Sequence, residues 1–425
     1  MKKIYWFLLL FSSFITAQEP DKIYMNNIKS VKLFQQNNQL SYPIINLNGG
    51  EILELHFDDL DGRVKNYFYS YQLCNADWTP VQLSTFDYLK GFSQNRLSQY
   101  RLSSISYAKY VHYQALLPDR NSTPTKSGNY LLKVFLDGDT SKLAFTKRIL
   151  VLDNLVSIGA QILQPFDNSL FRTHQKVNFT ISKNQLNLLN PMQQLKIVLL
   201  QNFRWDNAKT NIQPTFIRSN TIEFNTENDC VFAAGNEWRW ANLRSFRFLS
   251  DRVNASTYTK ETQEVIMKSD PVRSQLRYIN FLDYNGFYSV ESTDANNPWW
   301  QGDYAWVHFT FTPKDNQPYP NKKVYIIGEM NQYQTSADDA MEYDAANGLY
   351  KKSLYLKNGY YSYGYITKDI RTKQNTPLTE LTDGNFWETE NDYTILVYYR
   401  SIMGRHDELV GLTTINSLKS RRNGF

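Results

Sequence analysis

The sequence has few of the residues on which catalytic and metal-binding motifs depend. Cysteine occurs twice in 425 residues, at Cys74 and Cys230, and histidine five times, without a metal-binding spacing such as His-Glu-x-x-His. Two distant cysteines exclude a disulfide-dense scaffold. We expect two buried free thiols, with a disulfide as the alternative. Neither a glycine-rich phosphate loop nor a Gly-x-Ser-x-Gly elbow is present. We therefore predict a protein that is not an enzyme and has no catalytic residues, metal site or cofactor.

The chain also lacks a strong charge of one sign and a long hydrophobic run after its first residues. It has 46 Lys and Arg against 41 Asp and Glu, a net charge of +5. That balance does not suit a nucleic-acid-binding surface, which needs a clustered basic excess. Beyond residue 17, apolar runs are shorter than the roughly 20 residues that cross a bilayer, so we expect no direct membrane insertion.

Residues 1–17 have the order of a secretory signal peptide. Lys2 and Lys3 are followed by an apolar stretch from Ile4 to Ile15 and by the small residue Ala17. We predict cleavage after Ala17 and export to the periplasm. Because no cysteine follows the cleavage site directly, a lipid anchor is not expected.

Aromatic residues are abundant, and they favour strands. The chain has 30 Tyr and 25 Phe, and it shows no sustained helical period. Alternating segments separated by turn residues recur along the chain, for example at 52–57, 67–73 and 128–135. We predict an all-β protein of three consecutive immunoglobulin-like or fibronectin-like β-sandwiches. The predicted domains are 18–153, 154–271 and 272–402, followed by a tail at 403–425.

The most complete pattern lies in the last domain. Val324–Ile327 reads as a strand, Asn358-Gly359 as a tight hairpin turn, and Tyr361, Tyr363 and Tyr365 as one buried face of the returning strand. The strand 393–399 is expected to close this sandwich. The run Gly328–Tyr333 and the hairpin resemble the early-set, immunoglobulin-like modules that accompany starch-active enzymes. In those modules a Trp usually stands where this chain has Tyr333, so we do not expect α-glucan binding.

An acidic turn, Asp58-Asp59-Leu60-Asp61-Gly62, raises the question of a calcium loop. If Gly62 takes the sixth position of an EF-hand loop, the first and twelfth positions fall on Phe57 and Phe68, which cannot bind calcium. We therefore interpret the segment as a turn between strands.

Three tryptophans are candidates for a partner interface. Trp299 and Trp300 are adjacent, and on a strand they would point to opposite faces, so that one is buried and the other covers a domain junction. The alternative is an exposed aromatic anchor, because Trp buries much area on binding. Trp387 has the same two interpretations.

Taken over its whole mature length, the chain resembles the plug protein family of the type IX secretion system. The residues that carry the resemblance are Cys74–Trp78, Ser127–Tyr130, Gly384–Tyr393 and Val397–Arg400. The resemblance implies a periplasmic subunit, a monomer within a hetero-complex, that seals the periplasmic opening of an outer-membrane translocon barrel. Two other hypotheses remain open, an extracytoplasmic glycan-binding protein and an unrecognised enzyme acting on cell-wall material.

Overall fold

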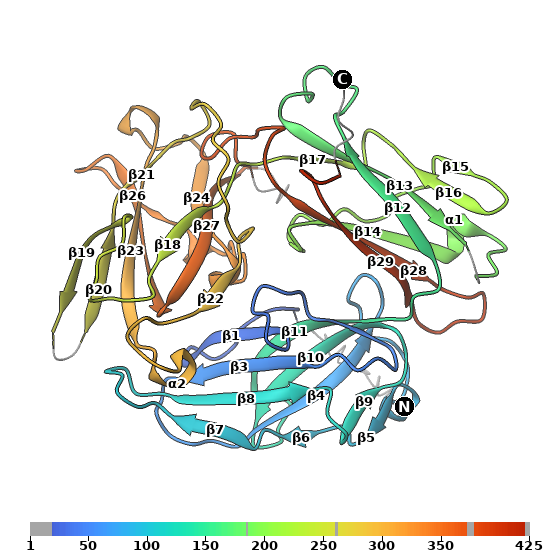
Figure 1. Cartoon of the computed structure of the whole chain (residues 1–425), viewed down its shortest axis with the longest axis horizontal. Coiled ribbons are helices and arrows are strands. Elements are labelled where there is room, and N and C mark those ends of the chain that lie inside the picture. The colour runs from blue at the N-terminus through green and yellow to red at the C-terminus, as the bar shows by residue number, and fades with distance from the viewer. Residues whose placement is uncertain (1–18, 184–185, 260–261, 372–377, 421–425) are drawn as a thin grey trace, which may run out of the picture.

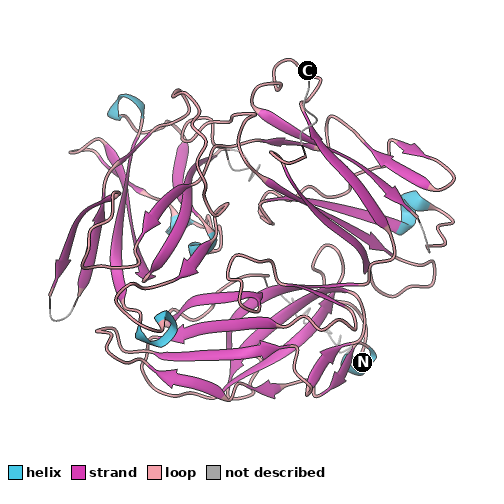
Figure 2. Ribbon diagram, in the orientation of Figure 1, coloured by secondary structure: helices cyan, strands magenta, loops and turns pink. Residues whose placement is uncertain are grey.

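The computed structural model describes residues 19–183, 186–259, 262–371 and 378–420. These residues form strands and loops, with helices of only three or four residues each (Figure 2). The strands make three β-sandwiches that are arranged as a triangle (Figure 1). The predicted all-β class is therefore confirmed. The predicted signal peptide, residues 1–17, lies outside the described residues.

Sandwich 1 packs two sheets around an aromatic and aliphatic core. In β4 (Tyr67–Cys74), the side chains of Tyr67, Tyr69 and Tyr71 all point inward and are buried, because alternate side chains of a strand share a face. The first sheet consists of β1 (Ile28–Gln35), β3 (Leu53–Asp59), β8 (Val111–Leu117) and β7 (Gln99–Leu102). The second consists of β2 (Ile44–Asn46), β11 (Leu143–Leu152), β10 (Gly128–Leu136), β4 (Tyr67–Cys74) and β6 (Asn95–Arg96). Outside these sheets lie η1 (Thr85–Asp87) and the ribbon of β5 (Leu89–Gly91) with β9 (Ser122–Pro124).

Sandwich 2 is built from strands of two distant parts of the chain. Its first sheet contains β12 (Ser157–Leu163), β13 (His174–Ser182), β16 (Thr221–Phe224), β15 (Phe216–Ile217) and β17 (Val231–Ala233). Its second sheet contains β14 (Leu195–Gln201), β28 (Asp392–Tyr399) and β29 (Glu408–Asn416), and the short helix α1 (Pro191–Gln194) precedes β14. Residues of both parts, such as Phe179 and Ile395, meet in one core.

Sandwich 3 contains the tyrosine row that the sequence predicts to be buried. Tyr361, Tyr363 and Tyr365 of β27 are at most 1% exposed, which confirms that prediction. Strand β27 (Gly359–Asp369) pairs with three other strands, which are β18 (Arg239–Asn242), β22 (Tyr288–Val290) and β24 (Lys322–Ile327). The opposite sheet contains β19 (Val253–Tyr258), β20 (Gln263–Met267), β21 (Asp270–Pro271), β23 (Tyr304–Thr312), β26 (Leu349–Lys357) and β25 (Glu342–Asp344). The short helices are α2 (Pro298–Gln301), η2 (Lys314–Asn316), η3 (Glu329–Asn331) and η4 (Ala337–Asp339).

The predicted assignment of strands to domains is wrong in two places. Strand β28 does not close sandwich 3; it pairs with β14 of sandwich 2, and β29 follows it within the predicted tail. Conversely, β18, β19 and β20, which fall inside the predicted middle domain, belong to sandwich 3. Alternation specifies which face of a strand is buried but not which strand lies beside it. Sandwich 3 is thus inserted between β17 and β28 of sandwich 2 and is connected to it by two chain crossings.

Trp299 and Trp300 lie in the helix α2 and not on a strand. Asn297 caps this helix, since its side chain accepts the backbone N–H of Trp299 at 3.0 Å, and Pro298 occupies the first helical position. These local preferences outweigh the β propensity of two tryptophans.

Candidate functional site

A buried charged group lies where sandwich 1 meets sandwich 3. Asp58, at the end of β3, is fully buried, and its carboxylate makes an ion pair with Lys357 of β26, which is also fully buried. The Tyr304 hydroxyl donates to Oδ2 of Asp58 at 2.5 Å, and Nδ1 of His112 lies 2.7 Å from Oδ1. Burial alone would raise the pKa of Asp58, but Lys357 and His112 outweigh it and hold the pKa below its ordinary value. One carboxylate of sandwich 1 therefore binds two side chains of sandwich 3.

Two histidines extend this group within sandwich 1. Nε2 of His112 lies 3.0 Å from Nδ1 of His56, and Glu54 is 3.6 Å from the other ring nitrogen of His56. Burial lowers the pKa of His112 to about 4, although Asp58 opposes the shift, and burial also lowers the pKa of His56. Both imidazoles are therefore neutral at pH 7 and can share one N–H. The Trp299 ring stacks on His56 with centroids 3.9 Å apart, so α2 of sandwich 3 covers the pair.

Further polar contacts continue along the same junction. Lys32 of β1 is fully buried and donates to the Glu329 carboxylate and, at 2.8 Å, to the Tyr288 carbonyl. Asp303 of sandwich 3 accepts the backbone N–H groups of Tyr107 and Ala108, each at 3.0 Å. Charged side chains thus connect the two sandwiches at several separate places.

The junction between sandwiches 1 and 2 combines a mainly aliphatic buried cluster with a group of aromatic residues around one arginine. The guanidinium carbon of Arg148, in β11, lies 4.9 Å from the ring centroids of both Trp78 and Trp205, and the side chain pairs with Asp21. Trp78 belongs to sandwich 1 and Trp205 to sandwich 2, and their rings also meet edge to face with centroids 5.0 Å apart, so one cation lies against two contacting indole rings from different sandwiches. Such contacts contribute up to about 2 kcal/mol when water is excluded.

Carboxylates gather at the junction between sandwiches 2 and 3. Asp283 accepts the backbone N–H groups of Trp238 and Asn285, the latter at 2.6 Å. Burial, followed by the nearby Glu237 and Glu390, raises the pKa of Asp283 to about 8. Asp283 is therefore mostly protonated at pH 7, which reduces the repulsion among the three carboxyl groups.

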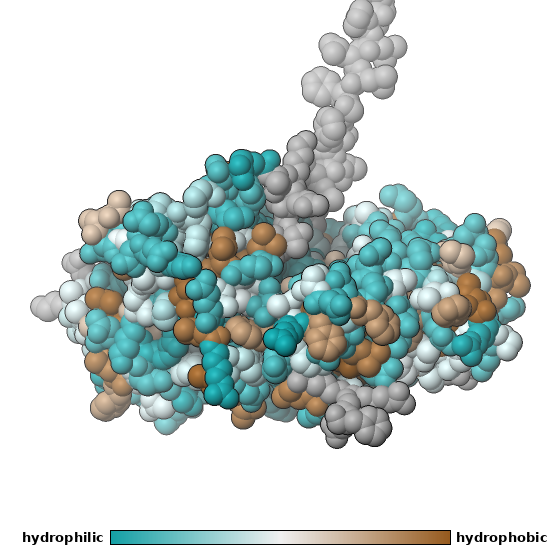
Figure 3. Space-filling view, turned by 90° about the horizontal axis from the view of Figure 1, so that it is seen from above, coloured by the Kyte–Doolittle hydropathy of each residue, from teal (hydrophilic) through white to brown (hydrophobic). Residues whose placement is uncertain are grey.

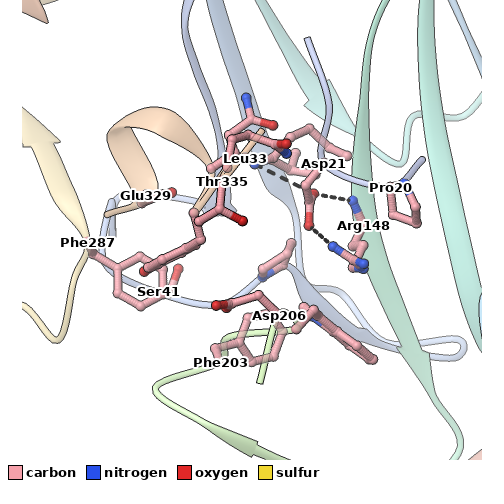
Figure 4. Close-up of a pocket in the computed structure, with 16 residues that line it drawn as sticks. Pro20, Asp21, Leu33, Ser41, Arg148, Phe203, Asp206, Phe287, Glu329 and Thr335 are labelled. Atoms are coloured by element: carbon pink, nitrogen blue, oxygen red, sulfur yellow. Dashed lines mark hydrogen bonds and ion pairs between the residues drawn. The ribbon is translucent and has the colours of Figure 1, made fainter. Parts of the chain in front are cut away.

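A cavity of about 300 Å³ lies where all three sandwiches meet. Figure 4 shows its wall, with Asp21 and Arg148 joined by an ion pair and with Phe203 and Asp206 on a loop of sandwich 2. Asp206 is paired with Arg204, which does not line the cavity. The charged side chains named here are already in ion pairs, so we interpret this cavity as part of the junction of the three sandwiches.

The described part of the chain contains no group of three His, Cys, Asp or Glu side chains placed to hold a metal ion. Cys74 and Cys230 are buried free thiols, as predicted, and burial raises the pKa of Cys74 to about 12. A thiol with that pKa is not a nucleophile at pH 7.

Two of the three candidate tryptophans, Trp299 and Trp300, lie at the junction of sandwiches 1 and 3, and Trp387 packs against sandwich 2. Trp299 is partly buried between His56 and the core of sandwich 3. Trp300 is partly buried over Arg101, with the guanidinium carbon 4.8 Å from its centroid. Trp387 is partly buried against the core of sandwich 2. The structure brings Trp299 and Trp300 together with the histidine pair, and places Trp387 apart from them.

Sequence reasoning missed a group of exposed apolar side chains beside the junction of sandwiches 1 and 3. Tyr107 and Tyr258 are in contact, with centroids 4.5 Å apart, and are 55% and 49% exposed. This pair separates two surface hollows, which we call the Trp306 hollow (about 410 Å³) and the Arg247 hollow (about 460 Å³) after a residue lining each. The two tyrosines are far apart in the chain, so no local pattern could have joined them.

Comparisons with known proteins give matches to a family model and to solved structures. Residues 28–153 match the model of the "Type 9 secretion system plug protein 1st domain". The fold is also similar to the crystal structure of a hypothetical protein from Parabacteroides merdae ATCC 43184, with a TM-score of 0.89 and 30% sequence identity. That match covers 94% of this chain and 100% of the other chain. The comparison with curated proteins gives no match. In the described residues, no helix is long and apolar enough to cross a membrane.

Proposed function

Because residues 28–153 match the first domain of the type 9 secretion system plug proteins, we propose that this chain belongs to that family and is a non-enzymatic periplasmic subunit that binds and seals the periplasmic opening of the outer-membrane translocon. The observation that carries the proposal is the match of sandwich 1 to the first domain of the plug proteins. A protein-secreting pore is wide enough to leak solutes when empty, so a stopper must keep its shape.

The three junctions support such a role. Asp58 with Lys357 joins sandwiches 1 and 3, and Arg148 between two tryptophans joins sandwiches 1 and 2. Sandwiches 2 and 3 are connected by two crossings of the chain. Each sandwich is thus fixed to both of the others, which favours a rigid body over a flexible chain of domains.

The surface of the protein is suited to an interface with a partner from which the protein must also separate. In the space-filling view, hydrophobic residues are scattered among hydrophilic ones (Figure 3). A moderate, partly polar interface is typical of complexes that form and separate, whereas obligate interfaces are larger and more hydrophobic.

The glycan-binding alternative receives less support from the geometry. Tyr333 is held in an edge-to-face contact with Trp238, with centroids 6.2 Å apart, and the Arg204 guanidinium lies 5.2 Å from its ring. A tyrosine used inside a junction does not offer a free flat face for a sugar. The cysteines are buried and the Asp58 carboxylate is already paired with Lys357, so neither supports the enzyme alternative.

Purification of the tagged full-length protein from detergent-solubilised envelopes tests the proposal. We expect a large outer-membrane barrel of the type 9 system to co-purify in defined stoichiometry, and not to co-purify with an unrelated periplasmic protein carrying the same tag. Recovery of the protein alone from cells that contain the translocon would contradict the proposal.

A further inference from the structure

The ring of three sandwiches is closed by the chain itself at only two of its three junctions. The chain passes from sandwich 1 to sandwich 2 between β11 and β12, and it crosses between sandwiches 2 and 3 at residues 234–238 and again at 384–391. No segment of the described chain runs directly between sandwiches 1 and 3, which face each other across the third junction (Figure 1). The ring can therefore open at this junction without any change in the path of the chain.

The contacts at the third junction also differ from those between sandwiches 1 and 2. There, Leu150 and Leu152 of sandwich 1 share a buried apolar cluster with residues of sandwich 2 such as Leu396. Among the described residues, none of the buried apolar clusters contains residues of both sandwiches 1 and 3. Ion pairs, hydrogen bonds and ring stacking hold that junction instead. A buried ion pair gives little net stability, because the desolvation of both charges offsets their attraction. The junction of sandwiches 1 and 3 is thus the weakest closure of the ring.

The two crossings between sandwiches 2 and 3 lie side by side and have the features of a hinge. The carbonyl of Gly235, in the first crossing, accepts the backbone N–H of Phe386 and the hydroxyl of Thr389, both at 2.9 Å and both from the second crossing. Each crossing contains a glycine with a left-handed φ, 67° at Gly235 and 80° at Gly384. Hinges are commonly a few loop residues that absorb changes in φ and ψ, which glycine does most readily. Because the crossings are adjacent, rotation about them moves sandwich 3 as one body.

The second crossing is anchored on both sides of its glycine. On the side of sandwich 3, the Arg239 guanidinium lies 2.7 Å from the Asp383 carboxylate. On the side of sandwich 2, the Gln175 amide donates to the Trp387 carbonyl at 2.7 Å. Rotation is therefore concentrated in the few residues around Gly384, and both anchors can persist while sandwich 3 turns.

We propose that sandwich 3 turns about Gly235 and Gly384, that its junction with sandwich 1 is a latch, and that sandwiches 1 and 2 stay together. In the closed ring, Asp58 with Lys357 and Lys32 with Glu329 hold the latch. Opening returns these charged groups to water, which restores the hydration that burial removes. The closed ring is the resting state, and the open ring exposes the face of sandwich 1 that Trp299 covers. The inference goes beyond the proposed function and does not depend on it.

Fluorescence energy transfer in the full-length protein tests the proposal. Ser93→Cys in sandwich 1, Ser219→Cys in sandwich 2 and Lys268→Cys in sandwich 3 place thiols at exposed positions, and pairs of them carry a donor and an acceptor dye. The dyes react with the introduced thiols, because Cys74 and Cys230 are buried. With rising urea, transfer between positions 93 and 268 is expected to fall at a lower concentration than transfer between positions 93 and 219, since the latch opens before global unfolding. Coincident loss of both signals, or earlier loss between positions 93 and 219, would overturn the proposal.

A variant of the latch gives a second test. Lys357→Met removes the cation of Asp58 and is expected to lower the urea concentration at which transfer between positions 93 and 268 falls, while the 93–219 midpoint stays unchanged. The matched change Lys351→Met, at a half-exposed lysine of the same strand, is expected to leave both midpoints unchanged. An equal shift of both midpoints in Lys357→Met would mean that the ion pair stabilises the whole protein and not a latch, and would overturn the proposal. If Lys357→Met does not fold, the wild-type comparison of the two dye pairs decides.

Discussion

Replacing Lys357 by methionine tests whether the Asp58–Lys357 pair holds sandwiches 1 and 3 together. Both side chains are fully buried, so the change keeps the volume of the long side chain but leaves the Asp58 carboxylate without its cation. Removing one partner of a buried pair costs about 3–5 kcal/mol. Because Tyr304 and His112 continue to hydrogen-bond to Asp58, we expect a loss near the lower end, about 3 kcal/mol.

Urea unfolding followed by tryptophan fluorescence measures this loss, since Trp299 lies directly over the network. Lys351→Met is the matched control on the same strand: Lys351 is half exposed and pairs with Asp344 at the surface, so its loss costs at most about 1 kcal/mol. In the double variant Asp58→Asn with Lys357→Met, neither charge remains, and we expect a smaller loss than the sum of the single changes. Equal losses for Lys357→Met and Lys351→Met would refute the reasoning.

The structure makes three further predictions. His112 has a pKa of about 4 in the folded protein and an ordinary value near 6.5 in the unfolded chain, so as the pH falls the unfolded chain binds the proton at a higher pH than the folded protein does. The contribution of His112 to the unfolding free energy should therefore be complete above pH ~6.5 and fall by up to about 3 kcal/mol toward pH 4. Equal urea midpoints at pH 7 and pH 4 would contradict this prediction. Arg148→Ala should lower the unfolding free energy by about 2 kcal/mol or more, because Trp78 and Trp205 lose the cation that lies against both rings and Asp21 loses its arginine partner. An unfolding midpoint equal to that of the wild type would contradict this prediction. The full-length protein should not bind maltoheptaose in calorimetry, and micromolar binding abolished by Tyr333→Ala would restore the glycan hypothesis.

Local patterns were sufficient to predict the fold class and several buried faces. The alternation of Tyr361, Tyr363 and Tyr365 after an Asn-Gly turn identified a buried strand face, because the period of two is a property of the strand itself. The same reasoning could not place β28. Its hydrophobic residues fit any sandwich core, and only the three-dimensional structure shows that β14 is its partner.

The charged network under Trp299 shows a second limit. The sequence pattern predicts Asp58 as part of an acidic turn, whereas the structure places it in β3, facing His112 and Lys357. These residues lie on strands of two sandwiches, and no spacing along the chain connects them. The reason for a buried aspartate is visible only together with its partners.

The permeability of the outer membrane tests the central claim most directly. Cells that lack this protein but retain the translocon should admit a large hydrophilic antibiotic, such as vancomycin, that the intact outer membrane excludes. Restoring the wild-type protein should restore exclusion, and removing the translocon as well should abolish the leak. Unchanged exclusion in cells that lack only this protein would contradict the account.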